Sequence, residues 1–127
     1  MGQAFGEWLE PKDVYEQKVI TDFVAPHPEE ATAYLAHVCG LMVDVARLLG
    51  HDEDIPLYEE YHRGCSEAYV HQFTPVEGPR QSKLVRPLAL GLLSGKIEEE
   101  TFGKLVESVQ SRNCRVGTGF LSTPLIL

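Results

Sequence analysis

Apolar residues recur at three- and four-residue steps between Pro28 and Gly50, which predicts one long amphipathic α-helix. Pro28 suits the first helical position, because its missing N–H would have no partner there, and Gly50 can adopt the left-handed conformation that ends a helix. A helix with a wide apolar stripe is stable only when other elements cover the stripe. The stripe consists of Ala31, Tyr34, Leu35, Val38, Leu41, Met42, Val45, Leu48 and Leu49.

The same periodicity predicts a second helix from about Pro56 to Gln72. A short polar link precedes it, in which Asp54 is the expected cap. Two long helices joined by so short a link form an antiparallel hairpin.

A second hairpin is expected further along the chain, after a loop rich in Pro and Gly. Its first helix contains Pro87, so this helix either kinks at Pro87 or begins there. Gly95 separates it from a clearer helix with acidic residues in its first turn. The apolar face of that helix consists of Phe102, Leu105, Val106 and Val109.

Both ends of the chain lack a clear period. Thr123 and Pro124 are typical of a helix start, yet only three residues follow. We therefore expect one partial domain that belongs to a longer architecture. Its expected parts are a loop-rich lead (1–27), a first helical hairpin (28–73), a second helical hairpin (80–112), and a loop with the start of a truncated helix (113–127).

Composition narrows the function classes. The 127 residues carry a formal net charge of -8, which argues against nucleic-acid and anionic membrane partners, because both require clustered Lys and Arg. We expect no membrane-spanning segment and no signal peptide, and hence a cytoplasmic location. The His and Cys residues lack the spacing of a metal site, so neither a metal nor another cofactor is expected.

Short segments resemble one enzyme family. F-G-E-W-L-E-P resembles the Gly-Asp-Trp-Leu segment of α-L-rhamnosidases, in their six-hairpin (α/α)-barrel glycosidase domain. R-Q-S-K-L-V-R-P-L-A-L-G-L-L is similar to the family's Thr-Gln-Thr segment and following helix, and R-V-G-T-G-F-L-S-T to its Thr-Gly-Phe-Leu-Gly-Thr signature. The resemblance covers nearly the whole chain in the family's order. It implies an all-α fold in which helical hairpins form part of such a barrel.

The chain departs from the family pattern at several positions. Glu7 stands where the family mostly has Asp, Ser122 replaces a Gly, Leu84 falls where Tyr is common, and Pro87 interrupts a normally smooth helix. The resemblance also places the family's general acid before this stretch and its general base after it. No catalytic residue is therefore expected among these 127 residues.

Glu7 and Trp8 are the strongest candidates for substrate binding. A carboxylate can accept hydrogen bonds from two sugar hydroxyls, and an indole can pack on a pyranose face. The alternative is that Trp8 anchors a loop while Glu7 lies at the surface. Phe120 could line the same cleft, although a Phe between glycines more often fills the space under a turn.

The sequence thus predicts a fragment of an α-L-rhamnosidase-like glycoside hydrolase, with a rhamnoside as the partner of the full enzyme and no activity in this chain alone. Whether the chain is itself an enzyme is left open. The alternative is a small helical interaction module that forms homo-oligomers through exposed apolar faces.

Overall fold

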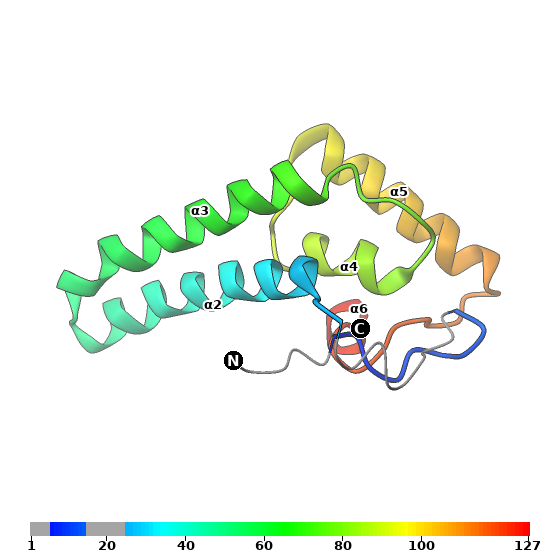
Figure 1. Ribbon diagram of the computed structural model, residues 1–127, viewed down its shortest axis with the longest axis horizontal. Helices are drawn as coiled ribbons and strands as arrows, with labels where there is room; N and C mark the ends of the chain where they lie inside the picture. The colour runs from blue at the N-terminus through cyan, green and yellow to red at the C-terminus, as the bar shows by residue number, and fades with distance from the viewer. Residues whose placement is uncertain (1–5, 15–24) are drawn as a thin grey trace.

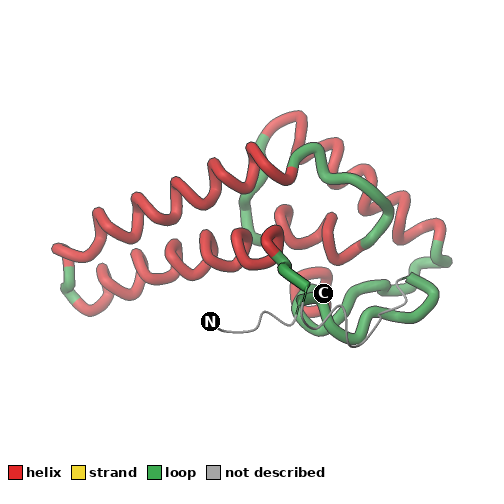
Figure 2. Tube along the Cα trace, in the orientation of Figure 1, coloured by secondary structure: helices red, strands yellow, loops and turns green. Residues whose placement is uncertain are grey.

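The computed structural model describes residues 6–14 and 25–127 (Figures 1 and 2), and every regular element in these residues is a helix. The expected all-α fold is therefore confirmed. The elements are α2 (Pro28–Leu49), the 3-10 helix η1 (Asp52–Asp54), α3 (Ile55–Phe73), α4 (Gln81–Ala89), α5 (Gly95–Ser111) and α6 (Thr123–Ile126).

Helices α2 and α3 form the expected first hairpin and lie side by side (Figure 1). Pro28 occupies the first turn of α2, and Gly50 ends the helix with a φ of 74°. The N–H of Gly50 donates to the carbonyl of Arg47 at 3.3 Å, and that of His51 donates to Ala46 at 2.9 Å. Asp54 directly precedes α3, but its side chain makes no capping hydrogen bond.

The face of α2 that this chain buries is not the predicted stripe. The buried residues are small ones on the opposite side of the helix. At one of them, the carbonyl oxygen of Ala36 lies 2.8 Å from Nδ1 of the His62 ring on α3, within hydrogen-bond distance. Short side chains let the two helices approach closely, whereas large ones would hold them apart. The predicted stripe is instead exposed, to 50% at Leu41 and 87% at Leu48. The buried residues of α2 are Ala33, Ala36, Cys39, Val43 and Ala46.

Helices α4 and α5 form a second antiparallel pair. Pro87 lies inside α4, so the alternative in which that helix begins at Pro87 is wrong. On α5 the buried positions are Thr101 and Ser108, whereas Phe102 is 57% exposed. Helix α5 thus resembles α2, with small or polar residues buried and part of its apolar stripe exposed, whereas α4 buries the apolar residues Leu84 and Val85.

The last element, α6, begins at Thr123 with Pro124 in its first turn, where the sequence predicted a helix start. The Thr123 hydroxyl does not cap the helix, since it donates to the carbonyl of Gly119 at 2.7 Å. Figure 1 shows that α6 and the loop 113–122 lie beside α4 and the segment 6–14.

The core lies where the two hairpins meet. It joins the first half of α2 and the last turns of α3 to α4 and the loops that flank α4. Its buried members are Ala33, Ala36, Tyr69, Val76, Leu84, Leu92 and Leu93.

Among the described residues, α2 is the one helix whose 22 residues and mean hydropathy of 1.3 would allow it to cross a membrane, by length and composition alone. The sequence-based expectation that no segment is long and apolar enough to span a membrane is therefore wrong for α2. One such helix is weak support for a membrane location, because core helices of soluble proteins pass the same test. The absence of a membrane partner stays a prediction.

Candidate functional site

Glu7 and Trp8 point in opposite directions from one loop. Glu7 is 4% exposed, whereas Trp8 is 43% exposed. The alternative in which Trp8 is the anchor and Glu7 lies at the surface is therefore wrong, and the two roles are reversed. The loop also depends on Gly6, which has a φ of 63° and lies against His27. The positive φ favours glycine at this position, and a Cβ there would also come within 2.5 Å of the His27 ring.

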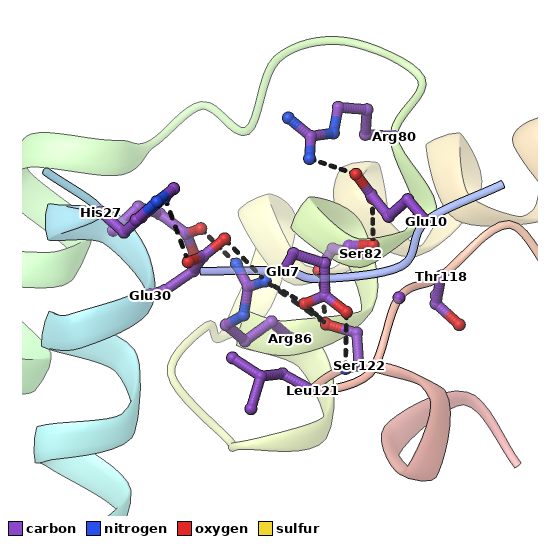
Figure 3. Close-up of polar contacts among 12 residues, drawn as sticks. Glu7, Glu10, His27, Glu30, Arg80, Ser82, Arg86, Thr118, Leu121 and Ser122 are labelled. Atoms are coloured by element: carbon purple, nitrogen blue, oxygen red, sulfur yellow. Dashed lines mark hydrogen bonds and ion pairs between the residues drawn. The ribbon is translucent and has the colours of Figure 1, made fainter. Parts of the chain in front are cut away.

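The carboxylate of Glu7 is held by Arg86, which projects from α4 and is fully buried (Figure 3). Arg86 Nη2 donates to Glu7 Oε2 at 2.7 Å, and the same guanidinium forms ion pairs with Glu29 and Glu30 at the start of α2. Burial by itself would lower the pKa of Arg86, but the carboxylates of Glu29, Glu30 and Glu7 outweigh it and raise that pKa. Arg86 therefore stays charged and joins α4 to α2 and to the loop 6–14.

Ser122 joins the C-terminal loop to the same carboxylate. Its N–H donates to Glu7 Oε1 at 2.9 Å and its hydroxyl to Glu7 Oε2 at 2.6 Å. Charge-assisted hydrogen bonds of this kind are stronger than neutral ones. Both oxygens of Glu7 are thus occupied from inside the protein.

Trp8 and Phe120 are exposed residues whose main chains lie side by side. The N–H of Phe120 donates to the carbonyl of Trp8 at 2.6 Å, and Phe120 is 71% exposed. The expectation that Phe120 fills the space under a turn is therefore wrong. Gly119 permits this close approach, because a Cβ there would lie 2.4 Å from the Trp8 carbonyl oxygen. We call the exposed side chains of Trp8 and Phe120 the aromatic edge.

A second set of polar contacts fixes the same loops at the start of α4. Buried Glu10 accepts hydrogen bonds from Arg80 and from the hydroxyl of Ser82. Gln81 is also buried, and its side chain accepts from the N–H of Gly117 at 2.6 Å and donates to the carbonyl of Arg115 at 3.2 Å. The segment Arg80–Ser82 thus positions both loops that carry the aromatic edge.

A pocket of about 660 Å³ lies next to this network. Glu7 lines it, whereas Trp8 and Phe120 do not, so the structure brings the three predicted residues to neighbouring surfaces rather than to one cavity. The lining comes from the starts of α2 and α4, the end of α3, and the loop between α3 and α4. Its members are Glu7, Ala25, Pro26, His27, Pro28, Glu29, Glu30, Tyr69, Gln72, Phe73, Thr74, Pro75, Val76, Glu77, Arg80 and Lys83.

Glu30 is the unusual residue of this pocket. Its side chain is 14% exposed and its Oε2 has no hydrogen-bond partner, although His27 Nδ1 lies 3.5 Å away. Burial raises the pKa of Glu30, while the charge of Arg86 opposes that shift. Neighbouring Glu29 differs, because its Oε1 accepts the hydroxyl hydrogen of Tyr69 at 2.6 Å. Glu30 Oε2 is therefore a buried carboxylate oxygen that lies in ion-pair range of His27.

The sequence did not indicate that Arg86 and Ser122 bind the carboxylate of Glu7. The available signal was the position of Arg86 directly after the apolar residues Leu84 and Val85. No group of three His, Cys, Asp or Glu residues that could hold a metal ion occurs in 6–14 and 25–127. The expectation that the protein uses no metal or other cofactor stays a prediction.

Comparison with known proteins adds a family match over residues 1–127, to the bacterial alpha-L-rhamnosidase 6 hairpin glycosidase domain. An α-L-rhamnosidase of Streptomyces avermitilis is 30% identical over 126 residues, which are 98% of this chain and 11% of that protein. An α-L-rhamnosidase of Formosa agariphila is 29% identical over 129 residues, which are 97% of this chain and 14% of that protein.

A solved structure shows the same arrangement of helices. The crystal structure of Streptomyces avermitilis α-L-rhamnosidase complexed with L-rhamnose superposes with a TM-score of 0.75 at 25% sequence identity. The match covers 100% of this chain and 12% of the other. The chain thus spans 11–14% of the length of these relatives.

Proposed function

The chain belongs to the bacterial α-L-rhamnosidase six-hairpin glycosidase family, and we propose that it forms part of the wall of a barrel that hydrolyses terminal α-L-rhamnosides. The names of its relatives and the L-rhamnose complex of the Streptomyces avermitilis protein support this substrate class. The two helical hairpins and their partly exposed apolar faces support the role of wall segment, because such faces need further helices beside them.

The aromatic edge is the part of this wall that contacts the sugar. The observation that supports this role is the backbone hydrogen bond from Phe120 N–H to the Trp8 carbonyl, which joins the two loops that carry these exposed aromatic residues. Aromatic rings bury a large apolar area in a defined geometry, and the apolar face of a pyranose fits such a surface. Glu7 supports this edge through Arg86 and Ser122, and its direct contact with a sugar stays a prediction.

Hydrolysis with inversion requires two carboxyl groups roughly 6.5–9.5 Å apart, one as general acid and one as general base. By the family resemblance, neither group belongs to this stretch of sequence. The chain on its own should therefore bind sugar without cleaving it.

Trp8 offers a direct test, because it is the single tryptophan of the chain. L-rhamnose should change the fluorescence of Trp8 in a saturable way, and Phe120→Ala should weaken that response. An exposed apolar residue far from the edge, Leu48→Ala, is the matched control. A response that is absent, or unchanged by Phe120→Ala, would contradict the sugar-contacting role. Cleavage of an aryl α-L-rhamnoside by the purified chain would contradict its inactivity.

The exposed apolar stripe of α2 favours a second candidate, a self-associating helical module without enzymatic activity. Sedimentation separates the two candidates. A single dimeric species that does not respond to L-rhamnose supports the module, whereas a rhamnose-responsive chain supports the barrel wall. The cytoplasmic location stays a prediction in either case.

A further inference from the structure

The two helices of the first hairpin each place a cysteine on the face that meets the other helix. Cys39 lies among the buried small residues of α2 and is 7% exposed. Cys65 lies on α3 and packs, partly buried, against the hydrophobic core. We propose that Cys39 and Cys65 are a redox pair, which closes into a disulfide between α2 and α3 when the protein is oxidised. This modification site lies apart from the aromatic edge and does not depend on the proposed function.

The contacts of His62 fix the level of the two cysteines along the hairpin. Nδ1 of His62 on α3 lies 2.8 Å from the carbonyl oxygen of Ala36, and a Cβ at Gly40 would lie 3.3 Å from the same nitrogen. The ring therefore meets α2 on both sides of Cys39. Cys65 follows His62 by three residues, close to one helical turn, so it leaves α3 from the same face.

The direction of the side chains brings the two thiols toward each other. The helices run antiparallel, so Cys65 lies one turn beyond His62 in the direction of the start of α2. Side chains in a helix lean toward its N-terminus, and Cys39 and Cys65 therefore lean toward each other across this step. The electrostatics agree, because the pKa of Cys39 is raised by burial and, to a smaller extent, by the neighbouring thiol of Cys65.

The small residues around Cys39 favour the backbone separation that a disulfide needs. A disulfide joins Cα atoms that are about 4.4–6.8 Å apart, which is close for residues on two different helices. Ala36 and Gly40 flank Cys39 on the packed face of α2, and their short side chains let α3 approach closely. Large side chains at these positions would hold the two cysteines too far apart to be joined.

Oxidised glutathione can serve as the oxidant in two balanced exchange steps. Cys65, the more exposed thiol, loses its proton and attacks one glutathione sulfur; the glutathione S–S bond breaks, and the released thiolate takes up a proton. Cys39 then loses its proton and attacks the Cys65 sulfur, which forms the bond between the helices and releases the second glutathione. The protein gives up two protons and two electrons, and one oxidised glutathione becomes two reduced molecules.

Exchange with oxidised glutathione tests the proposal on the folded chain, with Cys114→Ser to remove the exposed third thiol. Alkylation in urea and digestion with trypsin then locate the bond, because Arg47 and Arg63 place the two cysteines in separate peptides. Mass spectrometry should show these peptides as one linked species that dithiothreitol separates. Two alkylated cysteines, or a glutathione that stays on Cys65, would overturn the proposal.

Two further variants in this background tie the bond to the facing positions. Cys39→Ala should retain a glutathione on Cys65, because no second thiol is present to displace it. The double variant Cys39→Ala and Val38→Cys moves the thiol by one position, to a residue that is 49% exposed and leaves α2 in a different direction. It should likewise stay unlinked. Linkage as complete as that of the parent would mean that the bond forms without the native packing, and would overturn the assignment.

The disulfide should also stabilise the hairpin. It shortens the free chain of the unfolded state and fits the native packing, so the oxidised Cys114→Ser protein should melt about 10 °C above its reduced form. Circular dichroism of both forms measures this difference, and dithiothreitol should abolish it. A lower melting temperature in the oxidised form would mean that the helices must be displaced for the bond to form, and the two thiols would not be a native pair.

Discussion

At the scale of single residues, Arg86 is the side chain on which the site depends. It is fully buried and contacts Glu7, Glu29 and Glu30, which come from two segments far from it in sequence. Replacing buried ion pairs with apolar groups can be neutral, but removal of one partner alone leaves uncompensated buried charge.

Arg86→Met should therefore reduce the free energy of unfolding by about 3–5 kcal/mol, measured by urea denaturation. The control is Arg63→Met, since Arg63 is exposed on α3 and pairs with Glu67 at 3.5 Å in solvent; its cost should stay below about 1 kcal/mol. Similar losses for both variants would show that the buried network contributes no more than a surface ion pair.

Glu30 gives the site a dependence of stability on pH. Its pKa is raised in the folded protein by burial, so the folded state holds this proton more tightly than the unfolded chain. The stability that protonated Glu30 contributes is fully present below the unfolded pKa and is lost as pH rises through the folded pKa. The charged groups that act on it (Arg86, His27, Glu29 and Glu7) are the same in wild type and in Glu30→Gln, so the comparison isolates Glu30.

Glu30→Gln should accordingly become more stable relative to wild type as pH rises from the unfolded pKa of 4.5. Urea denaturation of both proteins at several pH values measures this difference. A difference that is constant with pH, or that falls as pH rises, would contradict the direction of the shift.

The residues of the site were only partly predictable from sequence. The adjacency of Glu7 and Trp8 and the Thr-Gly-Phe segment singled out two loops that the structure brings into contact. Their orientation was not predictable, because it depends on Arg86, and the sequence around Arg86 does not identify partners 57 and 79 positions away. Burial of a charge is decided by such distant partners.

At the scale of elements, periodicity predicted the helices of both hairpins but not the faces on which they pack. The pattern of α2 marks two faces, one of large apolar residues and one of small residues. The rule that large apolar residues lie inside selects the face of large residues. Helix α3 instead packs on the face of small residues, because short side chains let the two helices approach each other more closely. The large residues of α2 are mostly exposed in this chain, so a rule that assumes that they form a closed core fails here.

This assignment of faces predicts opposite outcomes for two substitutions on α2. Ala36→Leu should cost about 1–3 kcal/mol of stability, since Ala36 is fully buried and its carbonyl oxygen lies 2.8 Å from His62 Nδ1. Leu48→Lys should stay within about 0.5 kcal/mol, because Leu48 is 87% exposed and a cation near the end of a helix suits the helix dipole. Thermal denaturation followed by circular dichroism measures the stability change of each variant. A larger loss for Leu48→Lys than for Ala36→Leu would indicate that the predicted stripe is the packed face after all.

At the scale of the whole molecule, the two hairpins present apolar rows on their outer surfaces. Leu35, Val38, Leu41 and Leu48 are each about half exposed or more along α2, and Phe102 is 57% exposed on α5. Soluble monomers rarely leave contiguous apolar patches of this extent uncovered. The same helical arrangement occurs in a chain about eight times as long.

The isolated 127-residue chain should therefore bind a hydrophobic dye such as ANS and show a mass that rises with concentration. Changing Leu41→Glu together with Leu48→Lys should suppress both effects while helix content, measured by circular dichroism, stays the same, because neither side chain packs against α3. The paired substitution also leaves the net charge unchanged, so a gain in solubility would come from the lost apolar surface rather than from added charge. If the unsubstituted chain is monomeric and binds no ANS, the exposed apolar row of α2 is stable in water. The proposed role as a wall segment would then lose its main physical argument.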